Sequence, residues 1–166
     1  MITINQYKAI ENIIFNCGGL KADDSVLILC DASNRMIADE FLKCALSVNP
    51  KVKLMEIPDL PNHGAEPVGY AKEAMCRASL ILSLCRYSLA HSQARVDSSL
   101  TGARFLSLPL YDWFLLEDEC LRIDYSAQAG RVRKFADAFT EGQQVHITSV
   151  AGTNIRLGIT GRIGNY

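Results

Sequence analysis

The sequence lacks several features that would place it in a specialised class of protein. Its 17 Lys and Arg residues balance 18 Asp and Glu residues, and no basic block occurs. The electrostatic surface of a nucleic-acid-binding protein is therefore missing, and so is a polybasic segment for an anionic membrane. No apolar run approaches the roughly 20 residues that cross a bilayer, and residues 1–5 do not resemble a signal peptide. We expect a cytoplasmic protein that binds neither nucleic acid nor membrane.

Several chemical signatures are absent as well. The sequence contains no Gly-x-Gly-x-x-Gly motif and no Walker loop, which argues against the two common routes of nucleotide binding. It has no Gly-x-Ser-x-Gly elbow, and none of its six cysteines forms a Cys-x-x-Cys pair. Cys30 and Cys85 end apolar runs, and Cys44 and Cys76 lie within helical patterns. This distribution favours reduced core thiols over a disulfide framework or a zinc site, and we assign no catalytic residue.

The sequence alternates between two hydrophobic periods. Continuous apolar runs predict four strands that are buried on both faces, as in a parallel sheet, at residues 25–30, 52–57, 79–84 and 103–108. Helical spacing predicts helices at residues 5–16, 34–47, 68–77, 92–101, 111–118 and 124–140. This alternation is typical of an α/β protein. We predict a doubly wound, Rossmann-like parallel sheet of four to five strands with helices on both faces.

The end of the chain has a different pattern. Residues 145–150 and 155–159 alternate in period two around Ala151-Gly152-Thr153-Asn154, which predicts a C-terminal β-hairpin. We expect His146 to make a structural contact across this hairpin. The predicted organisation is an α/β domain at residues 1–142 followed by the hairpin at 143–166, either as an appendage or as the opening of another domain.

Open parallel sheets bind ligands beyond the carboxyl ends of their strands. The polar residues that follow the first three predicted strands are therefore the candidates for ligand binding, and they are Asp31, His63, Glu66, Ser88, His91 and Arg95. A helix that begins near Ser92 would favour an anion at its amino end, where Arg95 could form a bidentate ion pair with it.

Each of these candidates also has a structural interpretation. A solvated Asp31 beside a helix capped by Ser33 is the favoured interpretation of the first loop. His63 and Glu66 are two residues where a metal site needs three or four ligands, so a surface loop that closes over a cleft is favoured there. Arg95 is equally explained by a capped helix in which it pairs with Asp97 or another local acid.

Four motifs occur in the order found in the thermophilic metalloaminopeptidase family. They are His63-Gly64-Ala65-Glu66-Pro67, Ser88-Leu89-Ala90-His91-Ser92-Gln93-Ala94-Arg95, Gly102-Ala103-Arg104 and Ala151-Gly152-Thr153-Asn154. Nearly the whole chain resembles the amino-terminal part of this family, whose type is aminopeptidase T and to which a dihydroxypyridine ring-opening dioxygenase looks related. The resemblance implies an α/β amino-terminal domain.

The resemblance also implies where the chemistry lies. The family's metal ligands are Glu, His and Asp residues of a later carboxy-terminal domain, so a divalent zinc, cobalt or iron ion is expected only with that domain and no metal ligand is assigned to this chain. We expect an amino-terminal domain that shapes the cleft for a small-molecule or peptide substrate, supports a homodimer and is inactive alone. The alternatives are a freestanding module for a small anionic ligand and a self-association module that pairs through the hairpin edge.

Overall fold

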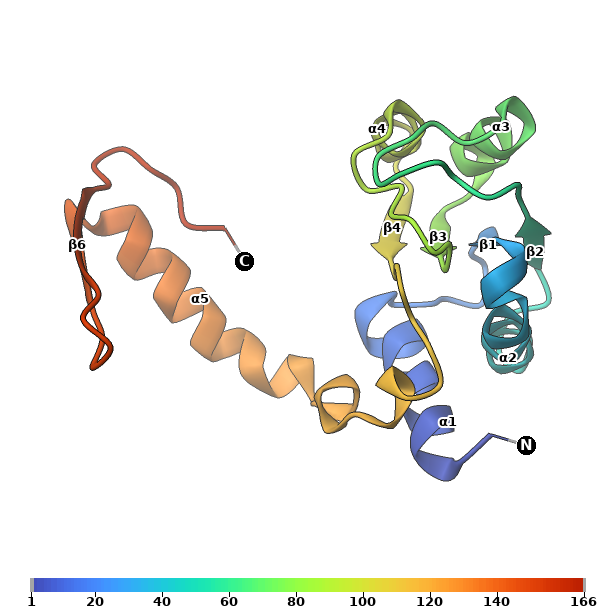
Figure 1. Ribbon diagram of the computed structural model, residues 1–166, viewed down its shortest axis with the longest axis horizontal. Helices are drawn as coiled ribbons and strands as arrows, with labels where there is room; N and C mark the ends of the chain where they lie inside the picture. The colour runs from blue at the N-terminus through green and yellow to red at the C-terminus, as the bar shows by residue number, and fades with distance from the viewer. Residues whose placement is uncertain (1, 166) are drawn as a thin grey trace. The chain divides into compact units, whose positions relative to one another are not determined.

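The computed structural model describes residues 2–165. It divides into two compact units, Met1–Ile123 and Asp124–Tyr166. The first unit contains the parallel sheet, and the second contains a long helix and the hairpin (Figure 1). The division of the sequence into domains at residue 142 stays a prediction, because compactness alone does not define a domain boundary.

The sheet of the first unit is parallel and has the strand order β2-β1-β3-β4. Its strands are β1 (Val26–Cys30), β2 (Val52–Glu56), β3 (Leu80–Ser83) and β4 (Arg104–Ser107). In its register, Val26 lies beside both Val52 and Leu80, and Leu80 lies beside Arg104. The order reverses at β1, which places a topological switch point between β1 and β3. The predicted doubly wound parallel sheet is confirmed.

Helices cover both faces of this sheet. The helices are α1 (Ile4–Glu11), α2 (Arg35–Leu46), α3 (Gly69–Arg77) and α4 (Gln93–Leu100). One apolar core joins alternate strand residues such as Ile28 and Leu82 to α1 and α2, and another joins Leu29 and Ile81 to α3 and α4. All five residues of β1 are buried, which explains its unbroken apolar sequence.

The predicted first helix has two parts with different hydrogen bonding. Thr3 and Gln6 form a reciprocal capping box that starts α1. The helix then continues as a π-helix at Asn12–Cys17 and ends where the Gly18 N–H donates to the carbonyl of Ile13, at 2.8 Å. The spacing of isoleucines in the sequence predicts the buried face but carries no sign of this change in pitch.

Three local expectations about helices are wrong. Ser33 caps no helix, because its hydroxyl donates to the Asp31 carboxylate at 2.6 Å. The helical spacing over residues 34–47 predicts Met36 on the same side as Ile37 and Phe41, but Met36 is 72% exposed, since the helix turns Ile37 and Phe41 into the core instead. The segment 111–118 contains the short 3-10 helix Leu115–Glu117, followed by another at Glu119–Arg122.

The second unit consists of α5 (Tyr125–Glu141) and the antiparallel strands β5 (Gln144–Thr148) and β6 (Asn154–Gly158). Asp124 caps α5 by accepting from the Ala127 N–H at 3.0 Å. Gly152 has φ +98° in the turn of the hairpin, a conformation that favours glycine. The predicted C-terminal hairpin is confirmed.

The surface of the second unit is rich in apolar side chains. Ala136 is the one residue of α5 classed as buried, at 6% exposed. Val132, Phe135 and Phe139 remain partly exposed and line a shallow cavity with Ile163. The unit therefore buries little of the apolar surface that its own sequence carries.

None of the six cysteines, all of which lie within the described residues 2–165, forms a disulfide bond. Cys30, Cys44 and Cys85 are buried, and burial raises the pKa of the Cys85 thiol to about 12. The expectation of core thiols is wrong for Cys17 and Cys120, which are exposed. Over residues 2–165, no helix is long and apolar enough to cross a membrane.

Candidate functional site

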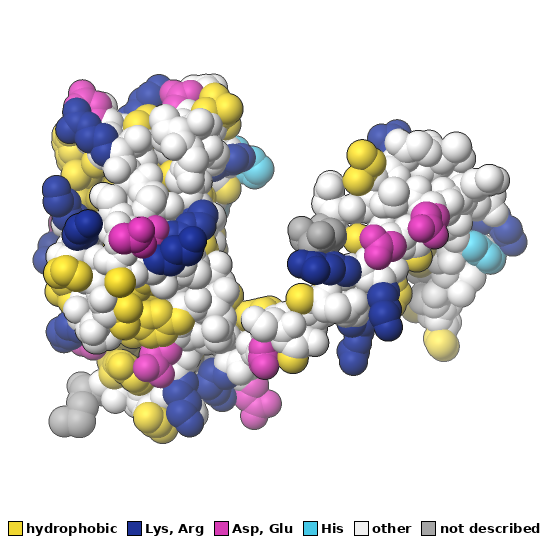
Figure 2. Space-filling view, turned by 180° about the vertical axis from the view of Figure 1, so that it is seen from behind, with side chains coloured by type: hydrophobic (Ala, Val, Ile, Leu, Met, Phe, Trp, Pro, Cys, Tyr) yellow, Lys and Arg dark blue, Asp and Glu magenta, His cyan; other side chains and the backbone are white. Residues whose placement is uncertain are grey.

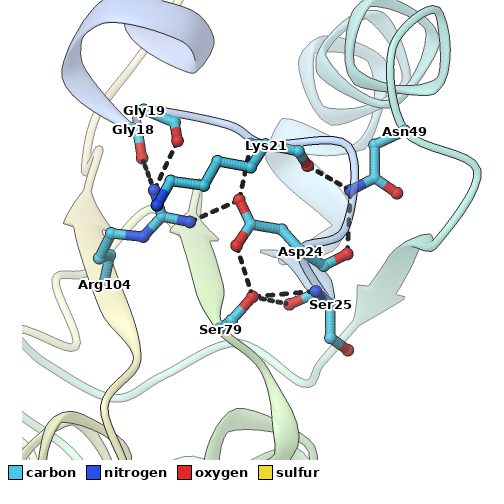
Figure 3. Close-up of polar contacts among 8 residues, drawn as sticks. All are labelled: Gly18, Gly19, Lys21, Asp24, Ser25, Asn49, Ser79 and Arg104. Carbon is cyan, nitrogen blue, oxygen red and sulfur yellow. Dashed lines mark hydrogen bonds and ion pairs between the residues drawn. The ribbon is translucent and has the colours of Figure 1, made fainter.

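The amino end of the parallel sheet is held by a buried carboxylate (Figure 3). One oxygen of Asp24 accepts from the Ser79 hydroxyl at 2.8 Å, and the other accepts from the Lys21 N–H at 2.7 Å and from Arg104. Burial alone would raise the pKa of the Asp24 carboxyl, but these hydrogen bonds outweigh it and hold that pKa below its usual value.

Arg104 connects this carboxylate to the end of the first helical segment. One nitrogen of its guanidinium donates to the Asp24 carboxylate, and the other donates to the carbonyls of Gly18 and Gly19. Gly19 has φ +57°, so the chain turns sharply where the guanidinium meets it. Every contact is within the protein, which gives the Gly102-Ala103-Arg104 motif a structural role at this end of the sheet.

Asp31 occupies the carboxyl end of β1, beside the switch point of the sheet. It is 2% exposed, and its carboxylate accepts from the Ser33 hydroxyl and from the backbone N–H of Arg86. Asn34 follows it and donates to the carbonyl of Leu84 at 2.6 Å. The favoured interpretation of Asp31 as a solvated residue is wrong. These side chains tie the loop after β1 to the loop after β3.

The two longest sequence motifs of the first unit contact each other. His63 Nδ1 accepts from the backbone N–H of Ser88 at 3.0 Å, and the Gly64 N–H donates to the Ser88 carbonyl at 2.8 Å. The His63 ring also packs edge-on against Tyr87, with 5.1 Å between the ring centroids. The loop after β2 is thereby fixed on the loop after β3.

Glu66 occupies the amino end of α4, where an anion was expected. Its carboxylate accepts from the backbone N–H groups of Gln93 and Ala94. The Ser92 side chain caps the same helix by accepting from the Arg95 N–H at 3.2 Å. The amino end of α4 therefore binds a carboxylate from the protein's own loop. The favourable interaction of the helix dipole with negative charge is made by Glu66 rather than by a ligand.

Arg95 lies one turn into α4 beside a small cavity. Its Nε donates to the carbonyl of Ala90 at 2.8 Å, which orients the guanidinium. The predicted ion pair with Asp97 is wrong, because that carboxylate bonds to Lys72 at 2.7 Å. The cavity measures about 320 Å³ and is lined by Ala90, His91, Arg95, Ser99, Phe105 and Ser107. It combines a cation, an imidazole, two hydroxyls and an aromatic ring.

Ser88 and Ser107 join the ends of two neighbouring strands. Their hydroxyls lie 2.8 Å apart, and Ser88 Oγ also accepts from the Ala90 N–H at 3.1 Å. Ser107 is the last residue of β4. Ser107 is not among the six predicted candidates, although it also lies at the carboxyl end of a strand, where ligands bind in open parallel sheets.

The six candidates therefore divide into three kinds. Asp31 is buried in a tie between loops, and Glu66 is committed to the amino end of α4. His63 and Ser88 bond to each other's loops. His91 and Arg95 line the cavity and could contact a ligand directly. A ligand role for any of the six remains a proposal.

The charge on this surface is mixed. Figure 2 shows basic and acidic side chains interspersed on the face of the first unit that it draws. Within residues 2–165 no three His, Cys, Asp or Glu side chains come together as a metal site would require. The acidic candidates Asp31 and Glu66 already accept hydrogen bonds from backbone groups. The side chains described do not fit a divalent metal.

A comparison with solved structures shows a similarity in fold. No known protein family and no curated protein sequence matches this chain. The solved structure of a 2,5-dihydroxypyridine dioxygenase from Pseudomonas putida KT2440 superimposes with a TM-score of 0.71 over 95% of this chain. The two sequences are 18% identical, and the match covers 48% of the dioxygenase. The chain thus shares its fold with about half of a longer protein.

Proposed function

We propose that this chain is the amino-terminal domain of an aminopeptidase-like metalloenzyme. In this proposal it shapes the substrate cleft and makes subunit contacts, and the segment that binds the metal lies outside residues 1–166. The observation that carries the proposal is the shared fold, which extends over 95% of this chain but 48% of the dioxygenase. The four ordered sequence motifs that resemble the metalloaminopeptidase family support it.

The proposal assigns binding and positioning to this chain. The cavity at the carboxyl end of the sheet offers Arg95 and His91 for a negatively charged group of a substrate, and Phe105 for an apolar part. The loop with His63 and Glu66 holds the cavity in shape through its bonds to Ser88 and to α4. A zinc, cobalt or iron ion in the other domain would supply the Lewis-acid or redox chemistry.

Two measurements test this proposal. The purified chain should contain no stoichiometric zinc, cobalt or iron by elemental analysis, and it should not hydrolyse peptide substrates when any of these ions is added. The reading frame beyond Tyr166 should continue into a segment with Glu, His and Asp ligands. A stop codon directly after Tyr166, or a metal bound at one ion per chain, would contradict it.

A second candidate function is the binding of a small anionic ligand by a freestanding module. The cavity beside α4 favours this candidate, because the bond from Arg95 Nε to Ala90 fixes a guanidinium at its wall. Pre-oriented guanidinium groups bind carboxylates and phosphates well. An aromatic carboxylate would place its ring near Phe105 and its charge near Arg95.

Thermal-shift titration with benzoate, acetate and phosphate tests the second candidate. Benzoate should raise the melting temperature of the wild-type chain, and Arg95→Ala should weaken its binding about tenfold, which corresponds to about 1.4 kcal/mol. Arg77→Ala is the matched control, because Arg77 lies on the exposed side of α3. Equal titrations for both variants, or no shift with any probe, would reject the candidate.

A further inference from the structure

Strand β5 has one edge whose backbone groups lack a partner strand. The backbone bonds Ser149 N–H to Thr153 O and Ile159 N–H to Gln143 O enclose the hairpin at its two ends. Hydrogen-bonded and non-hydrogen-bonded pairs alternate along an antiparallel ladder. The N–H and C=O groups of residues 144, 146 and 148 therefore point away from β6. In the part of the chain that the structure describes, β6 is the one strand that pairs with β5.

This edge lacks the usual protection against pairing with another strand. Exposed edges are commonly blocked by charged residues, by proline or by a bulge. The five residues of β5 include no Lys, Arg, Asp, Glu or Pro, and its register with β6 is unbroken. The other edge of the hairpin carries Arg156. The sequence thus leaves β5 open and protects β6.

The hairpin also has an apolar face that is only half covered. Val145 lies opposite Leu157 and Ile147 lies opposite Ile155, so the four side chains share one face. Ile147, Ile155 and Leu157 are each close to half exposed. Two-stranded hairpins are marginally stable in water, and additional strands with a shared apolar face stabilise them.

We infer that β5 pairs antiparallel with β5 of a second copy of this chain, about a two-fold axis at His146. In this register, Gln144 faces Thr148 of the second copy and His146 faces its counterpart. These are the three positions whose backbone groups point outward. The N–H and the C=O of each can therefore both form hydrogen bonds with the facing residue of the second copy. Val145 then lies beside Ile147 of the second copy, and one apolar face runs across four strands in the order β6-β5-β5-β6.

The charges favour this edge of the hairpin over the edge formed by β6. Pairing through β6 in the same manner would place Arg156 against Arg156 of the second copy, and like charges directly opposite each other are unfavourable. No formally charged side chain meets another across β5. The His146 ring is held by Asn154 of its own hairpin, with 2.8 Å between Nε2 and Oδ1. The inference rests on the part of the proposed function that gives this chain subunit contacts, and it is independent of the cavity.

Light scattering of the full 166-residue chain tests the pairing with two charge variants. Q144K/T148K places like charges opposite each other across the two-fold axis, whereas Q144E/T148K places opposite charges there. Within one hairpin the two positions do not face each other, since they pair with Gly158 and Asn154. The wild type and Q144E/T148K should have twice the chain mass of 18.3 kDa, and Q144K/T148K should have 18.3 kDa.

The controls distinguish loss of the β5 contact from a folding defect and from a loss of binding in the cavity. R156E changes the other edge and should leave the mass of the dimer unchanged. Both double variants contain T148K, so a folding defect from that change would appear in both. A monomeric wild type, or equal masses for the two double variants, would overturn the inference. Benzoate binding is measured on the same samples, so loss of the dimer and loss of the cleft function remain distinguishable.

Discussion

The two ends of the parallel sheet differ in how their polar groups are used. At the amino end, the buried Asp24 carboxylate forms an ion pair with the partly exposed Arg104 and accepts further hydrogen bonds from Lys21 and Ser79. At the carboxyl end, Glu66, His63 and Ser88 tie loops together around a cavity that Arg95 and His91 line. The polar groups at the amino end bind one another and hold the fold together, whereas Arg95 and His91 at the carboxyl end line a cavity.

The largest expected effect is on stability at the amino end. Arg104→Ala would leave the Asp24 carboxylate buried without its cation and would expose the carbonyls of Gly18 and Gly19. We expect a loss of about 2–3 kcal/mol, since hydrogen bonds to charged groups contribute about 1.5–3 kcal/mol. Urea denaturation measures it. Arg77→Ala, at an exposed ion pair, should change stability by less than about 0.5 kcal/mol.

The same carboxylate should make the amino end sensitive to acid. The pKa of Asp24 is lower in the folded chain than the unfolded value of about 3.9. Its stabilisation is therefore fully present above that unfolded value and is lost as the pH falls through the folded pKa. The difference in unfolding free energy between the wild type and Asp24→Asn should shrink in acid. A difference that stays constant from neutral to acid pH would contradict this assignment.

A smaller loss of stability is expected from the cap at the carboxyl end. Glu66→Gln removes the negative charge that accepts from the first backbone N–H groups of α4. We expect a loss of about 1 kcal/mol from the missing charge at the helix terminus. Chemical denaturation measures this change, and Glu73→Gln on the exposed face of α3 is the control. A loss as large as that of Arg104→Ala would remove the contrast between the two ends.

The smallest expected effect concerns the pair of hydroxyls between β3 and β4. Ser107→Ala removes the contact with Ser88 Oγ but leaves the bond from the Ala90 N–H in place. We expect a loss of about 0.5 kcal/mol or less, because Ser88 keeps another partner. Benzoate affinity should fall more clearly than stability, since Ser107 lines the cavity. An unchanged affinity would place the ligand away from the end of β4.

The fold could be predicted because its evidence is local in the sequence. The unbroken apolar run of β1 indicates a strand buried on both faces, and the alternation of Val145 and Ile147 indicates a half-covered hairpin. The positions of strands and helices follow from these periods. The order of the strands does not, because it depends on the handedness of crossovers and on contacts between distant segments.

The site could be predicted only in part, because its bonds join distant residues. Asp24 and Arg104 are 80 residues apart, and although Arg104 belongs to the Gly102-Ala103-Arg104 motif, no local pattern pairs it with Asp24. Glu66 reaches α4 across 27 residues, so its role as an internal anion has no signal in the spacing. The rule about carboxyl ends of strands did locate the region of the cavity. It could not separate residues that face the cavity from residues that tie the loops.

The bond between His63 and Ser88 fixes the hydrogen-bonding role that the imidazole can play toward a ligand. Nδ1 of this imidazole accepts from an amide N–H, so the neutral ring carries its proton on Nε2. The free nitrogen is therefore a donor, suited to hold an electronegative atom of a ligand. A ligand that bonds to this nitrogen would leave the bond from the Ser88 amide in place, while the Gly64 N–H and the Glu66 carboxylate anchor the same loop independently.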